Sequence, residues 1–293
     1  MESLLAPANL TMVFLVRDDG SSQPRPMPTV PLGMLNRAVT RAAHAGVQSV
    51  KLFSTDGRRD PIGSAGRSPH SLMAQAIHEV KVVDPSVTVL TETCLCSYTA
   101  SGECYIADRN GTPDVTATID AIAEQAVAQA DAGADVVGPA SMLGGSVRKV
   151  RQALDETGHA GVKIMPHLIF DSRLYEGYRQ TMGAVPVSGP RRAFQLAPSD
   201  SAAAIGAAAG LLAESADMLL LEPALFCADV LVVLNEHLKI PLAPFSVSGE
   251  YTMLGANTGN WDLLIELFTM LRRAGADSII TYAAVEIAEK MGN

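Results

Sequence analysis

Eight short apolar runs, each with the composition of a buried strand, alternate with longer helix-like segments along the 293 residues of the chain. The runs are MVFLV (12–16), SVKLF (49–53), VTVLTET (87–93), DVVGP (135–139), VKIMPHLIF (162–170), MLLLEPA (218–224), PLAPFSV (241–247) and SIITYAA (278–284). A strand that is apolar along its whole length is covered on both faces, as in parallel sheets. The pattern therefore predicts an α/β fold, a (β/α)8 TIM barrel, with a short N-terminal arm (1–11) before a single barrel domain (12–293). A doubly wound open sheet is the alternative, although no Gly-x-Gly-x-x-Gly follows a strand.

The balance of charge excludes some classes of partner. The formal net charge is −9, and hydrophobic residues make up 48% of the chain. Binding to nucleic acid needs a basic face, so we expect no nucleic-acid partner. No apolar run has the length of a membrane span, and the first ten residues carry an acidic group where a signal peptide carries positive charge. The sequence predicts a cytoplasmic enzyme with a small-molecule substrate and no membrane partner.

Chemistry in a TIM barrel takes place at the C-terminal ends of the strands. The polar residues expected at these ends are Asp18, Ser54, Glu92, Cys94, Ser141, His167, Asp171, Glu222, Ser248 and Tyr282. Two segments rich in Gly, Pro and Ser, 54–69 and 181–200, are long for connections between a strand and a helix. They are candidate lids over a site at this end of the barrel.

Three of the four cysteines follow the third strand within eleven residues. Cys94, Cys96 and Cys104 can meet at one point if their loop folds back, and three thiolates with an open fourth position suit a catalytic Zn2+. Such an ion polarises a carbonyl or lowers the pKa of a bound water. Three buried thiols are the alternative, and Cys227 is expected in the core.

Four segments of the chain resemble one known family. They are TETCLCSYTASGEC (91–104), EPALFCADVL (222–231), SVSGEYTML (246–254) and RRAGADSIITYAAVEIAE (272–289), and the similarity extends from about Pro26 to Glu289. The chain resembles the porphobilinogen synthase (5-aminolevulinate dehydratase) family. The resemblance implies a TIM barrel, zinc held by a Cys-x-Cys…Cys loop, and the condensation of two 5-aminolevulinate molecules into a pyrrole with loss of water. It also implies two barrel lysines that hold the substrates as Schiff bases.

The chain departs from the family at both of these lysines. Glu222 stands where one lysine precedes Pro-Ala, and the other lysine falls at Ile169 or Phe170, depending on the placement of a gap. An imine requires a neutral amine nucleophile, which glutamate cannot supply. Among the six lysines of the chain, Lys51 inside the second strand is the candidate substitute. The acidic phrase that the family carries after the fourth strand reads SMLGGS (141–146) here, and the family's aspartate before the cysteines is Glu92.

The chain retains residues that, by the resemblance, bind substrate carboxylates. Residues that match family positions for substrate binding are Arg179, Arg191, Gln195, Ser248 and Tyr282, with Arg192 able to take the role of Arg191. The candidate catalytic residues are Glu222, Glu92, His167 and Ser141, with Asp171 and Tyr175 as weaker candidates. Burial raises the pKa of a carboxyl group, which suits Glu222 to proton transfer near neutral pH. Alternatively, Glu222 pairs with a substrate ammonium or an arginine, and His167 is a core residue.

These observations predict a zinc-dependent lyase or condensing enzyme that acts on a small amino or keto acid by a route without a lysine imine, in specialised metabolism. A zinc- or ligand-binding homologue without catalysis is one alternative. A true porphobilinogen synthase that uses Lys51 or non-covalent binding is another. Only about ten residues precede the first strand, so the N-terminal arm through which family members form octamers is short, and we expect a homodimer or a higher homo-oligomer.

Overall fold

Eight parallel strands close into a barrel. The computed structural model describes residues 4–18, 24–189, 192–256 and 258–292. The barrel strands are β1 (Leu10–Arg17), β3 (Ser49–Thr55), β4 (Thr88–Thr93), β5 (Val136–Pro139), β6 (Lys163–Ile164) with β7 (His167–Ile169), β8 (Leu219–Glu222), β9 (Leu242–Ser246) and β10 (Ile279–Thr281). A short strand, β2 (Val30–Pro31), pairs with the end of β1.

The barrel closes through β6 and β7, which are two parts of one strand. The order of pairing runs β6-β5-β4-β3-β1-β10-β9-β8-β7, so β6 and β7 stand at its two ends. Only Met165 and Pro166 separate them. Met165 N donates to Val137 O of β5 at 2.9 Å, and Leu220 N of β8 donates to Pro166 O at 3.1 Å. The predicted barrel is confirmed, and each of the eight predicted apolar runs overlaps one strand or, for 162–170, this interrupted one.

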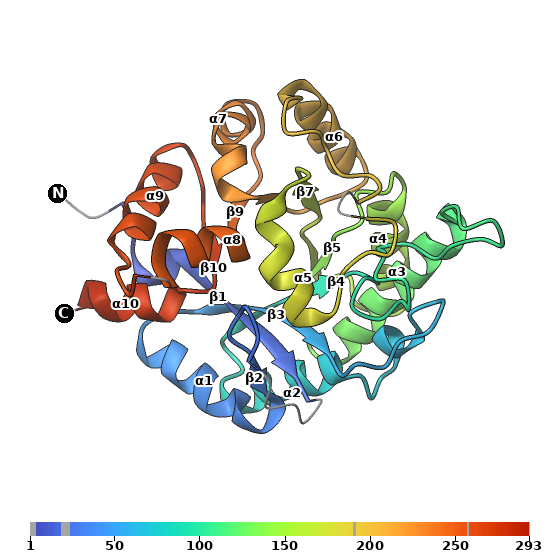
Figure 1. Ribbon diagram of the computed structural model, residues 1–293, viewed down its shortest axis with the longest axis horizontal. Coiled ribbons are helices and arrows are strands. Elements are labelled where there is room, and N and C mark those ends of the chain that lie inside the picture. The colour runs from blue at the N-terminus through green and yellow to red at the C-terminus, as the bar shows by residue number, and fades with distance from the viewer. Residues whose placement is uncertain (1–3, 19–23, 190–191, 257, 293) are drawn as a thin grey trace.

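Helices surround the strands (Figure 1). They are α1 (Leu32–His44), α2 (Leu72–Val83), α3 (Val115–Asp131), α4 (Ser146–Glu156), α5 (Glu176–Met182), α6 (Ser201–Ala213), α7 (Ala228–His237), α8 (Ser248–Tyr251), α9 (Asp262–Arg273) and α10 (Ala284–Gly292). Helices α2, α3 and α6 begin after Ser71, Asp114 and Asp200, whose side chains accept a hydrogen bond from the backbone three residues on. Short 3-10 helices η1 (Pro7–Asn9), η2 (Ser64–Arg67), η3 (Arg173–Tyr175) and η4 (Ala224–Cys227) and the π-helix η5 (Thr252–Ala256) complete the elements.

Two apolar layers hold the barrel together. One lies between the strands and the outer helices, and it includes Leu52, Leu168 and Leu221. The other fills the interior of the barrel, where alternate residues of the same strands point inward, such as Phe53 and Leu220. Because side chains alternate along a strand, Lys51 shares the inward direction of Phe53. No helix in the described ranges is long and apolar enough to cross a membrane.

The segment predicted as an N-terminal arm packs against its own barrel where the structure describes it. Leu5 is buried in the outer core, and η1 leads directly into β1, which begins at Leu10. The Leu4 carbonyl accepts a hydrogen bond from Arg272 Nε of α9 at 3.1 Å. Residues 4–9 therefore lie on the barrel of the same chain.

Candidate active site

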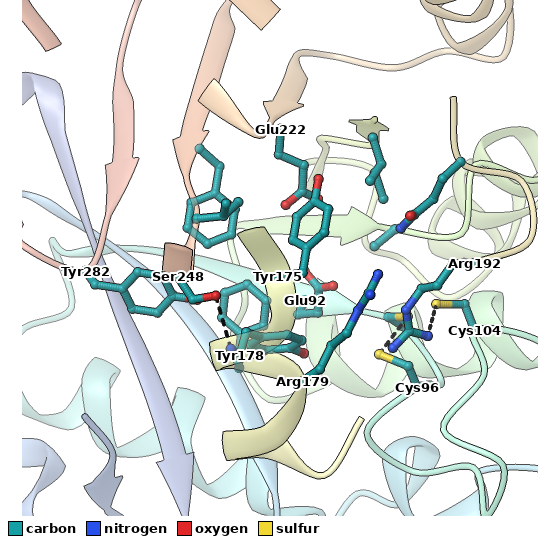
Figure 2. A pocket seen from close by; sticks show the side chains of 17 residues that line it. Glu92, Cys96, Cys104, Tyr175, Tyr178, Arg179, Arg192, Glu222, Ser248 and Tyr282 are labelled. Carbon is teal, nitrogen blue, oxygen red and sulfur yellow. Dashed lines mark hydrogen bonds between the residues drawn. The ribbon is translucent and has the colours of Figure 1, made fainter. Parts of the chain in front are cut away.

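A cavity of about 510 Å3, counting the open space at its mouth, lies at the C-terminal end of the barrel. Its lining residues are Phe53, Glu92, Cys94, Cys96, Cys104, Ala140, Ile169, Tyr175, Tyr178, Arg179, Arg192, Gln195, Glu222, Phe245, Val247, Ser248 and Tyr282. They come from strands β3, β4 and β7–β9 and from the loops and helices that follow strands. In Figure 2 the labelled arginines extend between the two glutamates and the thiols of Cys96 and Cys104. The cavity lies where the sequence places the chemistry of a TIM barrel.

Glu222 is the last residue of β8, and its side chain lines the cavity. It pairs in the sheet with Ile169, the last residue of β7, which also lines the cavity. The two positions predicted to correspond to the family's lysines are therefore neighbours, with Ile169 rather than Phe170 facing the cavity. Burial raises the pKa of Glu222 to about 8, although Lys51 and Arg179 act in the opposite direction. Glu222 therefore holds a proton at neutral pH.

Lys51 and His167 lie below the cavity, in the interior of the barrel. Lys51 Nζ is 3.1 Å from His167 Nε2, and His167 Nδ1 is 2.8 Å from Glu222 Oε1. Glu92 Oε2 lies 3.3 Å from Lys51 Nζ and 3.4 Å from His167 Nε2. Burial lowers the pKa of His167 to about 3, so this imidazole is neutral. His167 begins β7, which ends at Ile169. It is buried and does not line the cavity, but it contacts both glutamates that do.

Burial also raises the pKa of Glu92, against the opposing effects of His167 and Lys51. Its side chain lines the cavity from β4, which β5 and the β6–β7 strand separate from β8. Glu92 and Glu222 thus enclose the buried Lys51–His167 pair between them. A buried ammonium group is costly unless it is paired, and these two carboxyl groups are the acidic groups that act most strongly on Lys51.

The three thiols of the β4 loop converge. The Sγ atoms of Cys94, Cys96 and Cys104 all lie within 4.8 Å of one another, and Cys94 Sγ donates to Cys96 Sγ at 3.4 Å. Hydrogen bonds from Cys104 and Cys94 lower the pKa of the Cys96 thiol, and Arg192 and Arg59 lower it further. A soft metal ion needs thiolate ligands at one point, so this cluster fits a metal site. Cys227 lies in the outer core, as predicted.

Arg192 joins this cluster to the loop that follows α5. Its Nη1 donates to Cys104 Sγ at 3.1 Å and to Gly102 O at 2.9 Å, and its Nη2 donates to Ala184 O. Glu103 Oε1 accepts hydrogen bonds from the backbone and hydroxyl groups of Ser188 on the same loop. The described part of the predicted lid segment 181–200 is therefore fastened to the cysteine loop, and it contributes Arg192 and Gln195 to the cavity wall.

The other predicted binding residues differ in their surroundings. Arg179 on α5 is buried beside the ring of Tyr175, 5.4 Å from its guanidinium carbon to the ring centre. Ser248 Oγ donates to Leu174 O at 2.8 Å and accepts from Tyr178 N at 3.1 Å, so this hydroxyl positions the α5 segment as well as lining the cavity. Tyr282 packs on Phe245, with 5.6 Å between ring centres.

Several predicted positions do not line the cavity. Ser141 is buried in the loop after β5, and it does not belong to the cavity wall, nor does Asp171. Asp18 and Ser54 also lie outside the wall, and Arg191 lies outside the described residues. Of the candidate catalytic residues, Glu222 and Glu92 therefore reach the cavity, His167 lies beneath it, and Ser141 does not line it.

Sequence reasoning did not single out three aromatic residues and one arginine that shape the site. Phe53, Tyr178 and Phe245 form an aromatic wall, with 5.2 Å between the ring centres of Phe53 and Tyr178 and 6.0 Å between those of Phe53 and Phe245. Arg59 binds the carbonyls of Cys96, Thr99 and Met182, so it joins the two predicted lid segments. The strand alternation that turns Phe53 inward was a usable signal, whereas Arg59 lies in an irregular loop with no pattern.

The cavity of this closed parallel barrel combines a three-thiol cluster with arginines and buried carboxyl groups. These features define a class of protein, the TIM-barrel enzymes with a thiol-type metal site. Comparison with known proteins identifies the family to which the chain belongs within this class. The family model described as "Delta-aminolevulinic acid dehydratase" matches residues 1–290. The chain belongs to this family of lyases, which confirms the predicted resemblance.

Individual relatives agree with this assignment. The delta-aminolevulinic acid dehydratase of Bacillus subtilis is 32% identical and covers 98% of this chain and 92% of its own length. That of Mycobacterium tuberculosis is 34% identical, with 98% and 91% covered. The crystal structure of the Toxoplasma gondii enzyme in complex with its reaction product porphobilinogen superposes with a TM-score of 0.94 at 30% identity, and covers 99% of this chain and 86% of that one.

Proposed function

We propose that the chain is a zinc-dependent lyase or condensing enzyme that acts on a small amino or keto acid similar to 5-aminolevulinate, by a route without a lysine imine. Membership of the family supports the reaction class. The observation that carries the proposal is the β7–β8 pair, because Ile169 and Glu222 face the cavity side by side and neither is an amine. A role in specialised metabolism fits this loss of the family's nucleophiles.

The remaining lysines support a route without an imine. All six lie in the described part of the chain, and none of them lines the cavity. Lys51 comes nearest, but it is fully buried and engaged with Thr91, His167 and Glu92. To reach a ligand it would have to break these contacts and pass between two glutamates. Lys81, Lys149, Lys163 and Lys290 form ion pairs with aspartates outside the cavity, and Lys239 is exposed.

The groups that do line the cavity suggest how a small acid is held. Arg179 and Arg192 offer guanidinium groups that bind carboxylates, and Gln195 lies on the same side. Cys94, Cys96 and Cys104 would hold Zn2+, which supplies Lewis-acid charge to a substrate oxygen. Glu222, protonated at neutral pH, would donate a proton to the bound acid at the opposite side. The aromatic wall of Phe53, Tyr178 and Phe245 gives this space an apolar side.

Trapping with borohydride tests the absence of an imine. We expect that incubation of the zinc-loaded chain with 5-aminolevulinate and sodium borohydride leaves every lysine peptide at its unmodified mass, because no amine reaches the cavity. Peptide mass spectrometry provides the measurement. The variant Glu222→Lys is the matched control, since it returns an amine to the cavity wall and should acquire the reduced adduct. An adduct on Lys51 of the unmodified chain would instead support a true porphobilinogen synthase.

Turnover separates an enzyme from a binding protein. Consumption of 5-aminolevulinate or of related amino and keto acids, followed by NMR, should be detectable with the zinc-loaded chain. Full zinc occupancy without consumption of any such acid would favour the non-catalytic alternative. The homodimer or higher homo-oligomer and the cytoplasmic location stay predictions, and light scattering after size-exclusion chromatography measures the first.

A further inference from the structure

A line of polar side chains leads from the closed interior of the barrel to the cavity. Lys51 on β3 contacts His167 on β7, and His167 contacts Glu222 at the end of β8, at 3.1 and 2.8 Å. Lys51 and His167 are 0% and 1% exposed, whereas Glu222 lines the cavity. A core of apolar residues would be simpler to bury than an ammonium group, an imidazole and a carboxyl group. The burial of these three polar side chains therefore indicates a functional role.

We propose that Lys51 and His167 form a buried proton relay that orients the acid group of Glu222 and returns a proton to it after donation. The proposal rests on the proposed function of Glu222 as the proton donor of the site. Lys51 and His167 are positioning residues, because neither lines the cavity. Only Glu222 exchanges a proton with a ligand.

With Lys51 as an ammonium group, which only donates, its contacts assign a direction to each hydrogen bond. Nζ donates to Thr91 O and to His167 Nε2, both at 3.1 Å, and it forms an ion pair with Glu92 Oε2 at 3.3 Å. Nε2 of a neutral imidazole that accepts from Lys51 carries no proton, so the proton is on Nδ1. Nδ1 then donates to Glu222 Oε1. A proton held by Glu222 consequently resides on Oε2, the oxygen left for a ligand.

The relay step conserves atoms and charge. After Glu222 has given its proton to a ligand, its carboxylate accepts the Nδ1 proton of His167, while Nε2 takes one proton from the Lys51 ammonium. The N–H bonds at Nζ and Nδ1 break, and an N–H bond at Nε2 and an O–H bond at Oε1 form. Lys51 becomes a neutral amine, Glu222 a neutral acid, and the imidazole exchanges tautomers without becoming charged. The relay resets when the ligand gives a proton back to Oε2: Oε1 then returns its proton to Nδ1, and Nε2 returns one to Nζ, across the same 2.8 and 3.1 Å contacts.

Burial favours this exchange. It lowers the pKa of Lys51, against the opposing effects of Glu92 and Glu222, and it raises the pKa of Glu222 to about 8, against those of Lys51 and Arg179. Desolvation thus brings the proton affinities of the amine and the carboxylate toward each other. Cys96 also faces Glu222 and raises its pKa further. His167, whose pKa burial lowers to about 3, conducts the proton as a neutral group.

Gly138 of β5 provides the space in which Lys51 and His167 meet. A Cβ atom at this position would lie 3.2 Å from Lys51 Nζ and 3.1 Å from His167 Nε2, and only 2.7 Å from the Thr91 carbonyl oxygen. That oxygen is itself an acceptor for Lys51. A side chain at 138 would therefore separate the two ends of the first hydrogen bond of the relay.

Nitrogen-15 NMR of labelled histidine tests the relay in the zinc-loaded full chain. We expect the proton of His167 on Nδ1, because Glu222 Oε1 lies 2.8 Å away. In Lys51→Met the proton should stay there, but the Nε2 resonance should shift, because Nε2 loses its hydrogen bond from Lys51 Nζ. The substitution Lys163→Met is the matched control: it removes a lysine of β6 whose side chain is 60% exposed, and should leave the Nε2 resonance unchanged. The signal of His167 is assigned by its loss in His167→Gln.

A proton on Nε2 in the unmodified chain would overturn the relay, as would an Nε2 resonance that is the same in the unmodified chain and in Lys51→Met. If Lys51→Met does not fold, Lys51→Gln serves in its place, and the spectrum of the unmodified chain remains decisive. The measurement needs no substrate. Absence of turnover would thus refute the proposed function without affecting the tautomer of His167. A proton on Nε2 in the unmodified chain would refute the relay without affecting the turnover result.

Discussion

Glu222→Gln is expected to lower kcat for the small-acid substrate by about 10²- to 10⁴-fold, the range that a positioned acid or base contributes. Glutamine has the same shape and its oxygen can still accept from His167 Nδ1, but it has no proton to transfer. KM should change much less, because the arginines that would hold the carboxylate are untouched. Steady-state kinetics on the zinc-loaded chain give both constants. Glu236→Gln, an exposed position on α7, is the control.

The pH profile separates proton donation from a structural role for Glu222. Its raised pKa of about 8 means that the acid form, which donates, is present below that pH. Activity should fall as the pH rises through about 8, and Glu222→Gln should lose this fall together with most of the rate. A variant with near-normal kcat, or one that keeps the same descending limb, would contradict the assignment of Glu222 as the donor.

The same group also makes the stability of the folded chain depend on pH. Its folded pKa is raised above the ordinary value of 4.5, so the stability it contributes is present below that value and lost as the pH rises through about 8. Glu222→Gln cannot ionise, and its native state should be less sensitive to alkaline pH than that of the unmodified chain. Denaturant unfolding at several pH values measures this. A stable but inactive variant excludes unfolding as the cause of lost activity.

Cys96→Ser is expected to abolish stoichiometric zinc binding. The Cys96 thiol ionises most readily in the cluster, because Cys104 and Cys94 donate to it and Arg192 and Arg59 lie nearby. Loss of a hydrogen-bond partner of a ligand costs about 10- to 100-fold in metal affinity, and loss of the ligand itself should exceed that. Equilibrium dialysis followed by elemental analysis gives the zinc content, and the ultraviolet absorption of bound Cd2+ reports thiolate ligation directly.

Cys227→Ser provides the comparison for the metal site. This thiol is buried in η4, away from the cluster, so its substitution affects packing and should leave the zinc content at one per chain. Full zinc occupancy in Cys96→Ser, with the same Cd2+ absorption as the unmodified chain, would show that the three thiols are not the metal site. Activity of Cys96→Ser should fall in parallel with its zinc content.

The barrel could be predicted from the sequence because its strands are short apolar runs with helices between them. Their number and spacing leave few arrangements, and the runs at 162–170 and 218–224 carried the correct positions of Ile169 and Glu222. The cluster of Cys94, Cys96 and Cys104 could also be predicted, since three thiols within eleven residues can converge through local folding alone. Both features depend on residues that are close in sequence.

The Lys51–His167–Glu222 line could not be predicted in the same way. Alternation along the strand turns Lys51 inward, but it does not give the depth at which the side chain ends or what it meets there. The residues of this line come from β3, β7 and β8. More than a hundred positions of sequence separate β3 from β7. Contact between them depends on the twist and stagger of a closed barrel, which an individual run of sequence does not contain.

The missing Cβ atom at Gly138 restricts which relatives can share this interior. A relative with a lysine at the position of Lys51 but with alanine or a larger residue at the position of Gly138 would lack room for the amine to contact an imidazole. Glycine, lysine, histidine and glutamate at positions 138, 51, 167 and 222 should therefore occur together or not at all. Their joint presence gives a four-residue criterion for sorting uncharacterised relatives into those that use this interior and those that retain an amine at the cavity wall.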